Sequence, residues 1–208
     1  MKTTKMMKAN VKHYMKVLEV SDYVALCHEP EQTEQACRAC RNYGRCWTCP
    51  PFDYDVLSRV RRYAWVLVVG AQIVPDEALR NSPSSPTERN ELARRLIEMA
   101  WKQCTEPMMR AMERKHADSR LLCGFFACGE CSAHCARIDG RPCRHPELMR
   151  PSLEAYGFDV TRTTSELLGL ELKWGVENAL PEYTTLVTAL LTHERPDEPA
   201  AERWELTL

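Results

Sequence analysis

The chain has 208 residues, of which 44% are hydrophobic and 27% are charged, and its formal net charge is −1. This length and composition are typical of one globular domain, and the near-zero charge argues against a general affinity for nucleic acid or membranes. No apolar run approaches the roughly 20 residues that span a bilayer. The basic N-terminus lacks the apolar core of a signal peptide, so we expect a cytoplasmic protein that does not associate with membranes.

Cysteine usage is the most informative feature of the composition. The chain has 11 cysteines, and eight of them fall into two groups of four. In a reducing compartment stable disulfides are rare, and clustered cysteines more often bind metal or carry out redox chemistry. Cys27, Cys104 and Cys123 stand apart from the groups, and we interpret Cys27 and Cys104 as buried packing residues.

The first 27 residues predict two short elements. Apolar residues over 11–18 recur at helical spacing, which predicts a short amphipathic helix in an N-terminal extension over residues 1–21. Residues 23–27 form a short apolar run that predicts a strand ending at Cys27. The polar stretch over 28–36 is either a loop or the start of a helix.

The first cysteine group consists of two pairs, Cys37 with Cys40 and Cys46 with Cys49. A two-residue spacer lets both sulfurs of a pair face one metal centre while backbone N–H groups donate to them. Gly44 supplies a turn between the pairs, since glycine tolerates a positive φ. Two pairs this close predict a metal site, although a redox or disulfide pair on a loop remains the alternative.

The segment between the two groups predicts strands that alternate with helices. The predicted elements are a helix over 52–63 capped by Asp53, a buried strand over 65–69, a long helix from 87 to about 116 that Pro107 kinks or splits, and a strand over 120–127 that leads into Cys128. Beyond the second group, the pattern predicts short helices over 150–157 and 163–168 and a final strand over 183–191.

These elements indicate an α/β or α+β fold in a single domain over 22–192. We expect a small central sheet, flanking helices and cysteine-rich metal-binding loops. Residues 193–208 are acidic and contain prolines, so we expect a mobile tail in which Trp204 and Leu206 are candidates for docking onto the domain.

The second cysteine group places Cys128, Cys131 and Cys135 in a tight run, with Cys143 further along. Iron–sulfur clusters are often held in this way, with three thiolates from one loop and a fourth from a more distant residue. Three arginines are placed to offset the negative charge of such a cluster and raise its reduction potential, although the same residues fit an ordinary solvated face. They are Arg137, Arg141 and Arg144.

Zinc is the main alternative to iron and sulfur, because a four-cysteine zinc site also uses pairs with a two-residue spacer. The first group fits zinc nearly as well. The two groups can also share one site, with the 37/40 pair meeting the 128/131 pair. His134 and His145 are potential ligands, but we interpret them as neighbours of the site or surface residues, since four thiols already complete it.

Several of these motifs together resemble one known family. They are Cys40-Arg-Asn-Tyr-Gly, Cys46-Trp-Thr-Cys-Pro-Pro, Gly140-Arg-Pro-Cys-Arg-His-Pro and Arg150-Pro-Ser-Leu-Glu-Ala-Tyr-Gly-Phe-Asp-Val. The chain resembles domain-of-unknown-function family 2284, described as predicted cysteine-rich metal-binding proteins, over roughly residues 22–190. The resemblance implies no established reaction. It implies metal binding at Cys37, Cys40, Cys46, Cys49, Cys128, Cys131, Cys135 and Cys143.

Taken together, the sequence predicts an iron–sulfur protein with one or two 4Fe-4S clusters that acts in electron transfer or redox sensing with a redox partner protein. The alternatives are a structural zinc-binding protein that serves as an interaction module, and a cluster-dependent reductase or accessory factor. The chain has no glycine-rich phosphate loop and no nucleophile–base signature, so the sequence leaves open whether it is an enzyme. It also leaves the oligomeric state open.

Overall fold

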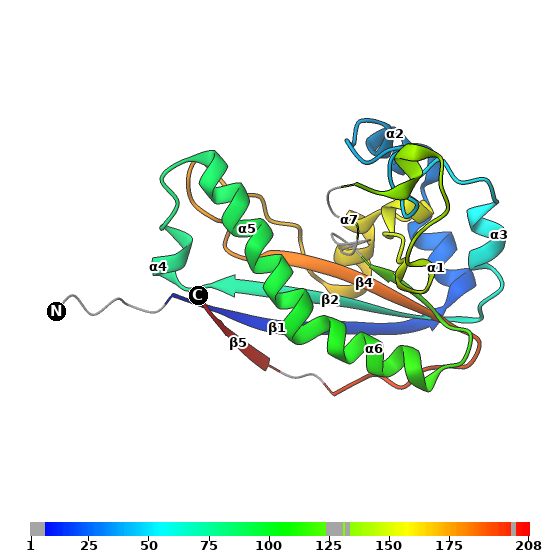
Figure 1. Cartoon of the computed structure of the whole chain (residues 1–208). Coiled ribbons are helices and arrows are strands. Elements are labelled where there is room, and N and C mark those ends of the chain that lie inside the picture. The colour runs from blue at the N-terminus through cyan, green and yellow to red at the C-terminus, as the bar shows by residue number, and fades with distance from the viewer. Residues whose placement is uncertain (1–6, 124–130, 132–133, 201–202) are drawn as a thin grey trace.

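An antiparallel sheet of five strands runs through the part of the chain that the structure describes, which is residues 7–123, 131, 134–200 and 203–208. The structure is a computed structural model. Its strands lie in the order β3-β4-β2-β1-β5, of which Figure 1 labels β4, β2, β1 and β5. The strands are β1 (Lys8–Glu19), β2 (Trp65–Pro75), β3 (Arg120–Cys123), β4 (Thr184–Thr192) and β5 (Arg203–Thr207). All neighbouring pairs are antiparallel, so the fold is α+β in a single domain, one of the two predicted classes.

The helices pack on both faces of the sheet. They are α1 (Val20–Cys27), α2 (Pro30–Arg38), α3 (Val56–Val60), α4 (Glu77–Arg80), α5 (Pro86–Ala100), α6 (Glu106–Lys115) and α7 (Val160–Arg162). Short 3-10 turns occupy Ala136–Asp139, Pro146–Leu148 and Glu154–Tyr156, and π-helical turns occupy Trp101–Thr105 and Thr163–Leu167.

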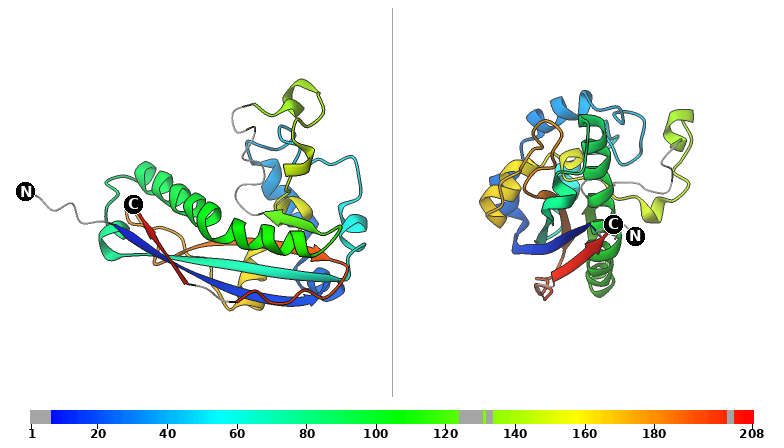
Figure 2. Two further views of the ribbon diagram at one scale, coloured as in Figure 1. Left: turned by 60° about the horizontal axis from the view of Figure 1, so that its bottom comes forward. Right: turned by 90° about the vertical axis from the view of Figure 1, so that its left-hand side faces the viewer.

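Strand β2 shows how the two faces are covered. Leu67 and Val69 point to the face that α5 and α6 cross, whereas Val66 and Val68 point to the face that packs against α1 (Figures 1 and 2). Side chains alternate along a strand, so a strand that is buried on both faces is apolar at every position. This is why the predicted strand over 65–69 reads as a continuous apolar run, and β2 confirms it.

The predicted helix over residues 11–18 is wrong, because these residues belong to β1. The strand pairs with β2 over 9–19 and with β5 over 8–12. Its buried residues alternate, as Ala9, Val11 and His13 show. The alternation is not evident in the sequence, because His13 is a polar residue at a buried position. In the structure its Nε2 lies 3.0 Å from Oγ1 of Thr105, a hydrogen-bonding distance. The N-terminal stretch is therefore part of the central sheet and not a helical extension.

The predicted strand over residues 23–27 is also wrong, because these residues form the second half of α1. Val20, Tyr23 and Cys27 are the buried residues of this helix, and their spacing of three and four residues is helical. A run as short as 23–27 does not distinguish a strand from a helix by periodicity. The polar stretch that follows is helix α2 from Pro30 onward.

The long helix predicted from residue 87 to about 116 is present as α5, a π-helical turn and α6. The N–H of Glu106 donates to the carbonyl of Trp101, five residues earlier, so the turn before Pro107 is wider than an α-helical turn. A proline ring inside a helix collides with the carbonyl four residues back, and a wider turn gives it room. The helix therefore accommodates Pro107 by a change of winding.

The predicted mobile tail over 193–208 contains a strand instead. Residues Arg203–Thr207 form β5, which pairs with the edge of β1. Leu206 is 1% exposed and packs in the core, whereas Trp204 is 40% exposed. Docking is thus confirmed for Leu206.

The other predicted elements agree with the structure at their centres. Strand β4 confirms the strand over 183–191, and β3 covers the first four residues of the strand over 120–127, whose remainder lies outside the described residues. The helix over 52–63 is shortened to α3, and its cap is Asp55, not Asp53, because the Asp55 carboxylate accepts a hydrogen bond from the Ser58 N–H at 3.2 Å.

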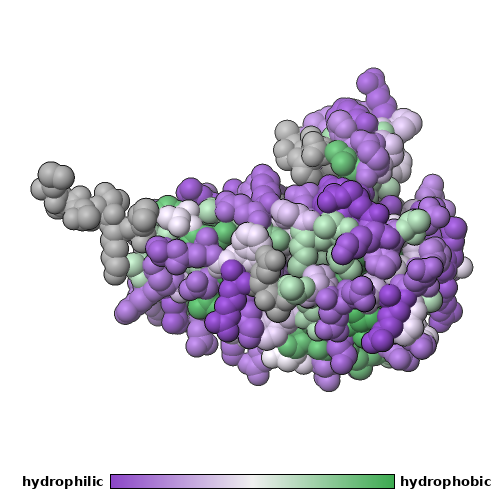
Figure 3. Space-filling view, turned by 90° about the horizontal axis from the view of Figure 1, so that it is seen from below, coloured by the Kyte–Doolittle hydropathy of each residue, from purple (hydrophilic) through white to green (hydrophobic). Residues whose placement is uncertain are grey.

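Viewed from below, the molecular surface is mostly hydrophilic, and hydrophobic residues reach it in limited patches (Figure 3). Within the described ranges, no helix combines the length and the hydrophobicity that crossing a bilayer requires.

Candidate metal centre

The first cysteine group begins with Cys37 in the last turn of α2 and continues on the tightly wound loop that follows this helix. Both pairs adopt the same local turn, in which the second cysteine donates its N–H to the carbonyl of the first. The distance is 2.9 Å from Cys40 to Cys37 and 3.1 Å from Cys49 to Cys46. Gly44 has a φ of +67°, and its N–H donates to the Pro50 carbonyl at 2.8 Å, which closes the loop between the pairs. The turn predicted at Gly44 is confirmed.

The second cysteine group lies in a segment whose two ends are fastened to the core. At the entrance, the N–H of Cys123 in β3 donates to the Pro151 carbonyl at 3.0 Å. Cys135 is buried and precedes a 3-10 turn that ends at Gly140, where φ is +65°. Cys128, predicted as the first ligand of this group, lies outside the described residues.

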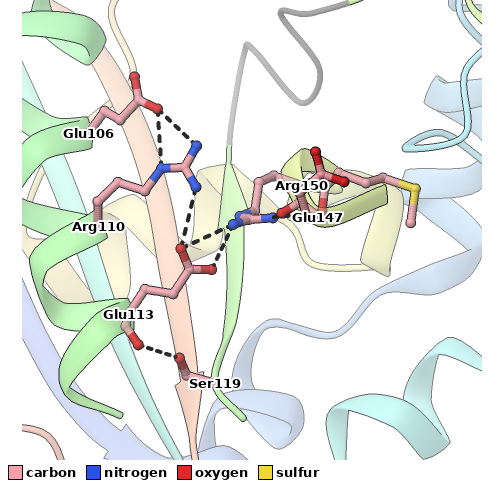
Figure 4. Close-up of polar contacts among 7 residues, drawn as sticks. Glu106, Arg110, Glu113, Ser119, Glu147 and Arg150 are labelled. Carbon is pink, nitrogen blue, oxygen red and sulfur yellow. Dashed lines mark hydrogen bonds and ion pairs between the residues drawn. The ribbon is translucent and has the colours of Figure 1, made fainter. Parts of the chain in front are cut away.

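The exit of this segment is held by the ion-pair network drawn in Figure 4. The Arg150 side chain is 11% exposed and contacts both carboxylate oxygens of Glu113 on α6, at 3.0 and 3.1 Å. Arg110 joins the same carboxylate at 3.6 Å and also pairs with Glu106 at 3.2 Å. Arg150 donates as well to the Glu147 carbonyl at 2.6 Å. Helix α6 therefore fixes the chain just after the last cysteine.

The two cysteine segments touch each other through Arg137 and Trp47. The Arg137 guanidinium donates to the carbonyls of Cys46 at 2.8 Å and Cys49 at 2.6 Å, and to that of Pro51. In return, the indole N–H of Trp47 donates to the Arg141 carbonyl at 3.0 Å. The chain thus brings two groups that are about 90 residues apart in sequence to one place. Sequence reasoning assigned Arg137 to charge compensation and missed its bonds to the first loop.

The thiols of the first loop influence one another electrostatically. Burial raises the pKa of Cys37, and the nearby carboxylate of Glu154 and the thiol of Cys40 raise it further. Burial also raises the pKa of Cys49, and Cys40 and Cys37 add to this rise. The thiolate forms of Cys37, Cys40 and Cys49 therefore repel one another, and a bound cation would offset this repulsion.

Charged side chains surround the second group. The Arg144 guanidinium lies 4.0 Å from the sulfur of Cys131 and donates to the His134 carbonyl at 2.9 Å. His134 turns away to Asp139, whose carboxylate is 2.9 Å from its Nε2, and its side chain is half exposed. It therefore lies beside the segment as a surface residue.

The eight predicted ligands can be tested against this geometry. Across the described residues, no three side chains of histidine, cysteine, aspartate or glutamate converge closely enough to hold a metal ion. Their chemistry nevertheless fits a metal, because all seven described candidates are cysteines on adjoining segments, and thiolates are the ligands that zinc and iron–sulfur clusters prefer. The described ligands are Cys37, Cys40, Cys46, Cys49, Cys131, Cys135 and Cys143.

The three cysteines outside the groups are buried in the core. Cys27, Cys104 and Cys123 are each at most 2% exposed. Burial raises the pKa of Cys104 to about 11 and that of Cys123 to about 12, so both remain protonated thiols at neutral pH. The packing role predicted for Cys27 and Cys104 agrees with this burial.

A cavity of about 400 Å³ opens behind the first loop, between Pro51 and the 3-10 turn at Glu154–Tyr156. Its walls include the aromatic rings of Phe52 and Tyr54. His28 also lines it, and burial lowers the pKa of that imidazole. Sequence reasoning missed this cavity, because its walls come from three segments that carry no shared motif.

Comparison with known proteins gives one match. The profile of the family described as predicted metal-binding protein (DUF2284) matches residues 24–192, which is most of the chain and includes all eight clustered cysteines. Searches of curated proteins and of solved structures found no match.

Proposed function

The chain belongs to the DUF2284 family of predicted metal-binding proteins, and from this premise we propose that it binds one or two 4Fe-4S clusters and acts in electron transfer or redox sensing. The ligands are the two cysteine groups. In the first group they are Cys37, Cys40, Cys46 and Cys49, and in the second Cys128, Cys131, Cys135 and Cys143. Such a cluster supplies one-electron redox chemistry when bound.

The contact between the two cysteine segments is the observation that carries this proposal. Arg137, from the second segment, donates to the carbonyls of two ligands of the first, Cys46 and Cys49. Metal sites commonly hold their ligands through such outer contacts, which orient the donor atoms. If each group held its own cluster, the two would be neighbours in adjoining segments, and a single shared cluster would be held by residues of both segments.

The charges around the loops favour a redox role over a purely structural one. Arg137 and Arg144 place positive charge beside both groups, and Arg144 lies 4.0 Å from the Cys131 sulfur. A 4Fe-4S cluster with four thiolates carries net negative charge, so these guanidinium groups stabilise it and raise its reduction potential. A structural zinc site gains no function from such tuning. We expect a redox partner protein to approach the exposed side of these loops.

The proposal is tested by purifying the protein without oxygen and recording its visible spectrum. A brown protein with a broad absorption band that dithionite bleaches supports a 4Fe-4S cluster. A colourless protein with stoichiometric zinc overturns it and leaves a zinc-bound interaction module.

The iron content of a double variant tests how many clusters the protein binds. Replacing Cys37 and Cys40 with serine removes about half of the iron if each group holds its own cluster, and nearly all of it if the groups share one. Cys104→Ala is the matched control, because this buried cysteine lies outside both groups. Equal iron loss in this control would show that the loss reflects misfolding.

A further inference from the structure

A second cavity, of about 580 Å³, lies between α5, residues 172–175 and the start of β4. None of the described cysteines lines it, so it is separate from the metal centre. Its walls are largely apolar, with Ile97 of α5, Leu172 and Leu186 of β4 among them. Trp174 also lines the cavity and is 80% exposed, which places its ring at the opening. Cavities of this size and character are the usual sites for small organic ligands.

The charges that line the cavity are mainly positive. Arg89, Arg94 and Lys173 contribute cations, and Glu154 contributes the carboxylate that opposes them. Arg94 pairs with Glu98 at 3.4 Å, and Lys173 pairs with Glu171 at 2.7 Å. Both pairs are exposed, and exposed pairs contribute little free energy, so a bound anion competes with them readily.

Thr184 and Thr185 at the start of β4 also line the cavity. Neighbouring residues of a strand face opposite sides, and the Oγ1 atoms of both threonines are buried, so the cations and the apolar walls are the features that favour a ligand.

Arg89 builds one wall of the cavity and is not free to bind a ligand itself. Its Nη1 donates to the Glu177 carbonyl at 2.6 Å and to the Gly175 carbonyl at 3.4 Å, and its Nε and Nη2 donate to Asn90. A Cβ at Gly175 would lie 2.7 Å from Arg89 Cδ, so only glycine allows this approach. The loop that carries Trp174 is therefore fixed to α5, and the cavity is preformed.

We propose that this cavity binds a small organic anion with a hydrophobic body, of the class of aromatic or aliphatic carboxylates. Lys173 and Arg94 pair with the carboxylate, and the apolar walls and Trp174 enclose its body. This activity goes beyond metal binding and does not depend on it.

The proposal is tested with 2-naphthoate and its neutral counterpart 2-naphthamide as probes, added to the full-length protein. Naphthoate is expected to bind saturably at one site, to shift the tryptophan fluorescence, and to bind at least about fivefold more tightly than the amide, the size of one exposed ion pair. The fluorescence shift disappears in Trp174→Phe, whereas binding measured by titration calorimetry persists.

Variants separate binding from folding. Lys173→Gln and Arg94→Gln each weaken naphthoate binding by about fivefold, while Arg95→Gln, an exposed charge on the same helix outside the cavity, leaves it unchanged. Absence of saturable binding, equal affinity for the amide, or an equal effect of Arg95→Gln would overturn the proposal.

Discussion

Replacing Arg137 with alanine removes the side chain that joins the two cysteine segments. The three carbonyls to which it donates belong to Cys46, Cys49 and Pro51. A hydrogen bond from a charged donor contributes about 1.5–3 kcal/mol when it is buried. Arg137 is only partly buried, so we take about 1 kcal/mol for each bond after solvent screening. The variant is therefore expected to lose about 3 kcal/mol of unfolding free energy, measured by urea denaturation.

The same variant is expected to hold its metal less tightly. Removing a side chain that orients metal ligands typically costs 10–100-fold in affinity. The assay is iron retention against a chelator. Arg137→Lys keeps the charge but not the planar fork, so it is expected to recover only part of the affinity.

Arg141→Ala is the matched control for Arg137→Ala. It removes the same charge from the same segment, while the Trp47 indole still donates to the backbone carbonyl at position 141. If Arg137→Ala and Arg141→Ala lose stability and metal equally, the contact between the segments is not what holds the site, and the reasoning fails.

Three further predictions concern the scaffold. Burial lowers the pKa of His13 below its ordinary value of 6.5, so the unfolded chain binds a proton at a higher pH than the folded chain does. The free energy of unfolding is therefore expected to fall as pH drops below about 6.5, by at most about 1.4 kcal/mol per pH unit. His13→Gln should remove this one-proton slope from urea titrations. Gly157→Ala is expected to destabilise by at least about 1 kcal/mol, because φ is +84° there and the new Cβ would lie 2.7 Å from Nε2 of His28; an unchanged urea midpoint would contradict this. Arg150→Met removes the closer of the two guanidinium groups that pair with Glu113 and leaves Arg110 at 3.6 Å, so it should cost about 2 kcal/mol in the same assay, whereas a loss below about 1 kcal/mol would mean that the network in Figure 4 does not anchor the segment.

The parts of the fold that sequence predicted are those in which local pattern and burial agree. The apolar runs of β2 and β4 are buried on both faces, and the helical stripe over α5 and α6 survives the proline at 107. Strand β1 was missed because His13 is a polar residue at a core position, and only its partner Thr105, far along the chain, makes that burial tolerable. Strand β5 was missed because its acidic surroundings favour a tail, and pairing with β1 outweighs them.

In the candidate site, too, local features could be predicted from the sequence, whereas contacts between distant segments could not. The turn at Gly44 was predicted, since a turn depends on neighbouring residues alone, whereas the hydrogen-bonded turns at Cys37–Cys40 and Cys46–Cys49 were not among the predictions. The meeting of the two groups depends on Arg137 and Trp47, whose partners lie about 90 residues away. Trp47, which lies between the paired Cys46 and Cys49, was the one available signal in the sequence. Its partner, the Arg141 carbonyl, cannot be identified from the sequence alone.

The central claim is that the two cysteine groups hold iron and sulfide. It is tested most directly by measuring iron, acid-labile sulfide and zinc in anaerobically purified protein, with paramagnetic resonance of the dithionite-reduced form. We predict about four iron and four sulfide per cluster, little zinc, and the signal of a reduced 4Fe-4S cluster. Stoichiometric zinc without iron or sulfide, and no paramagnetic signal, would contradict the account.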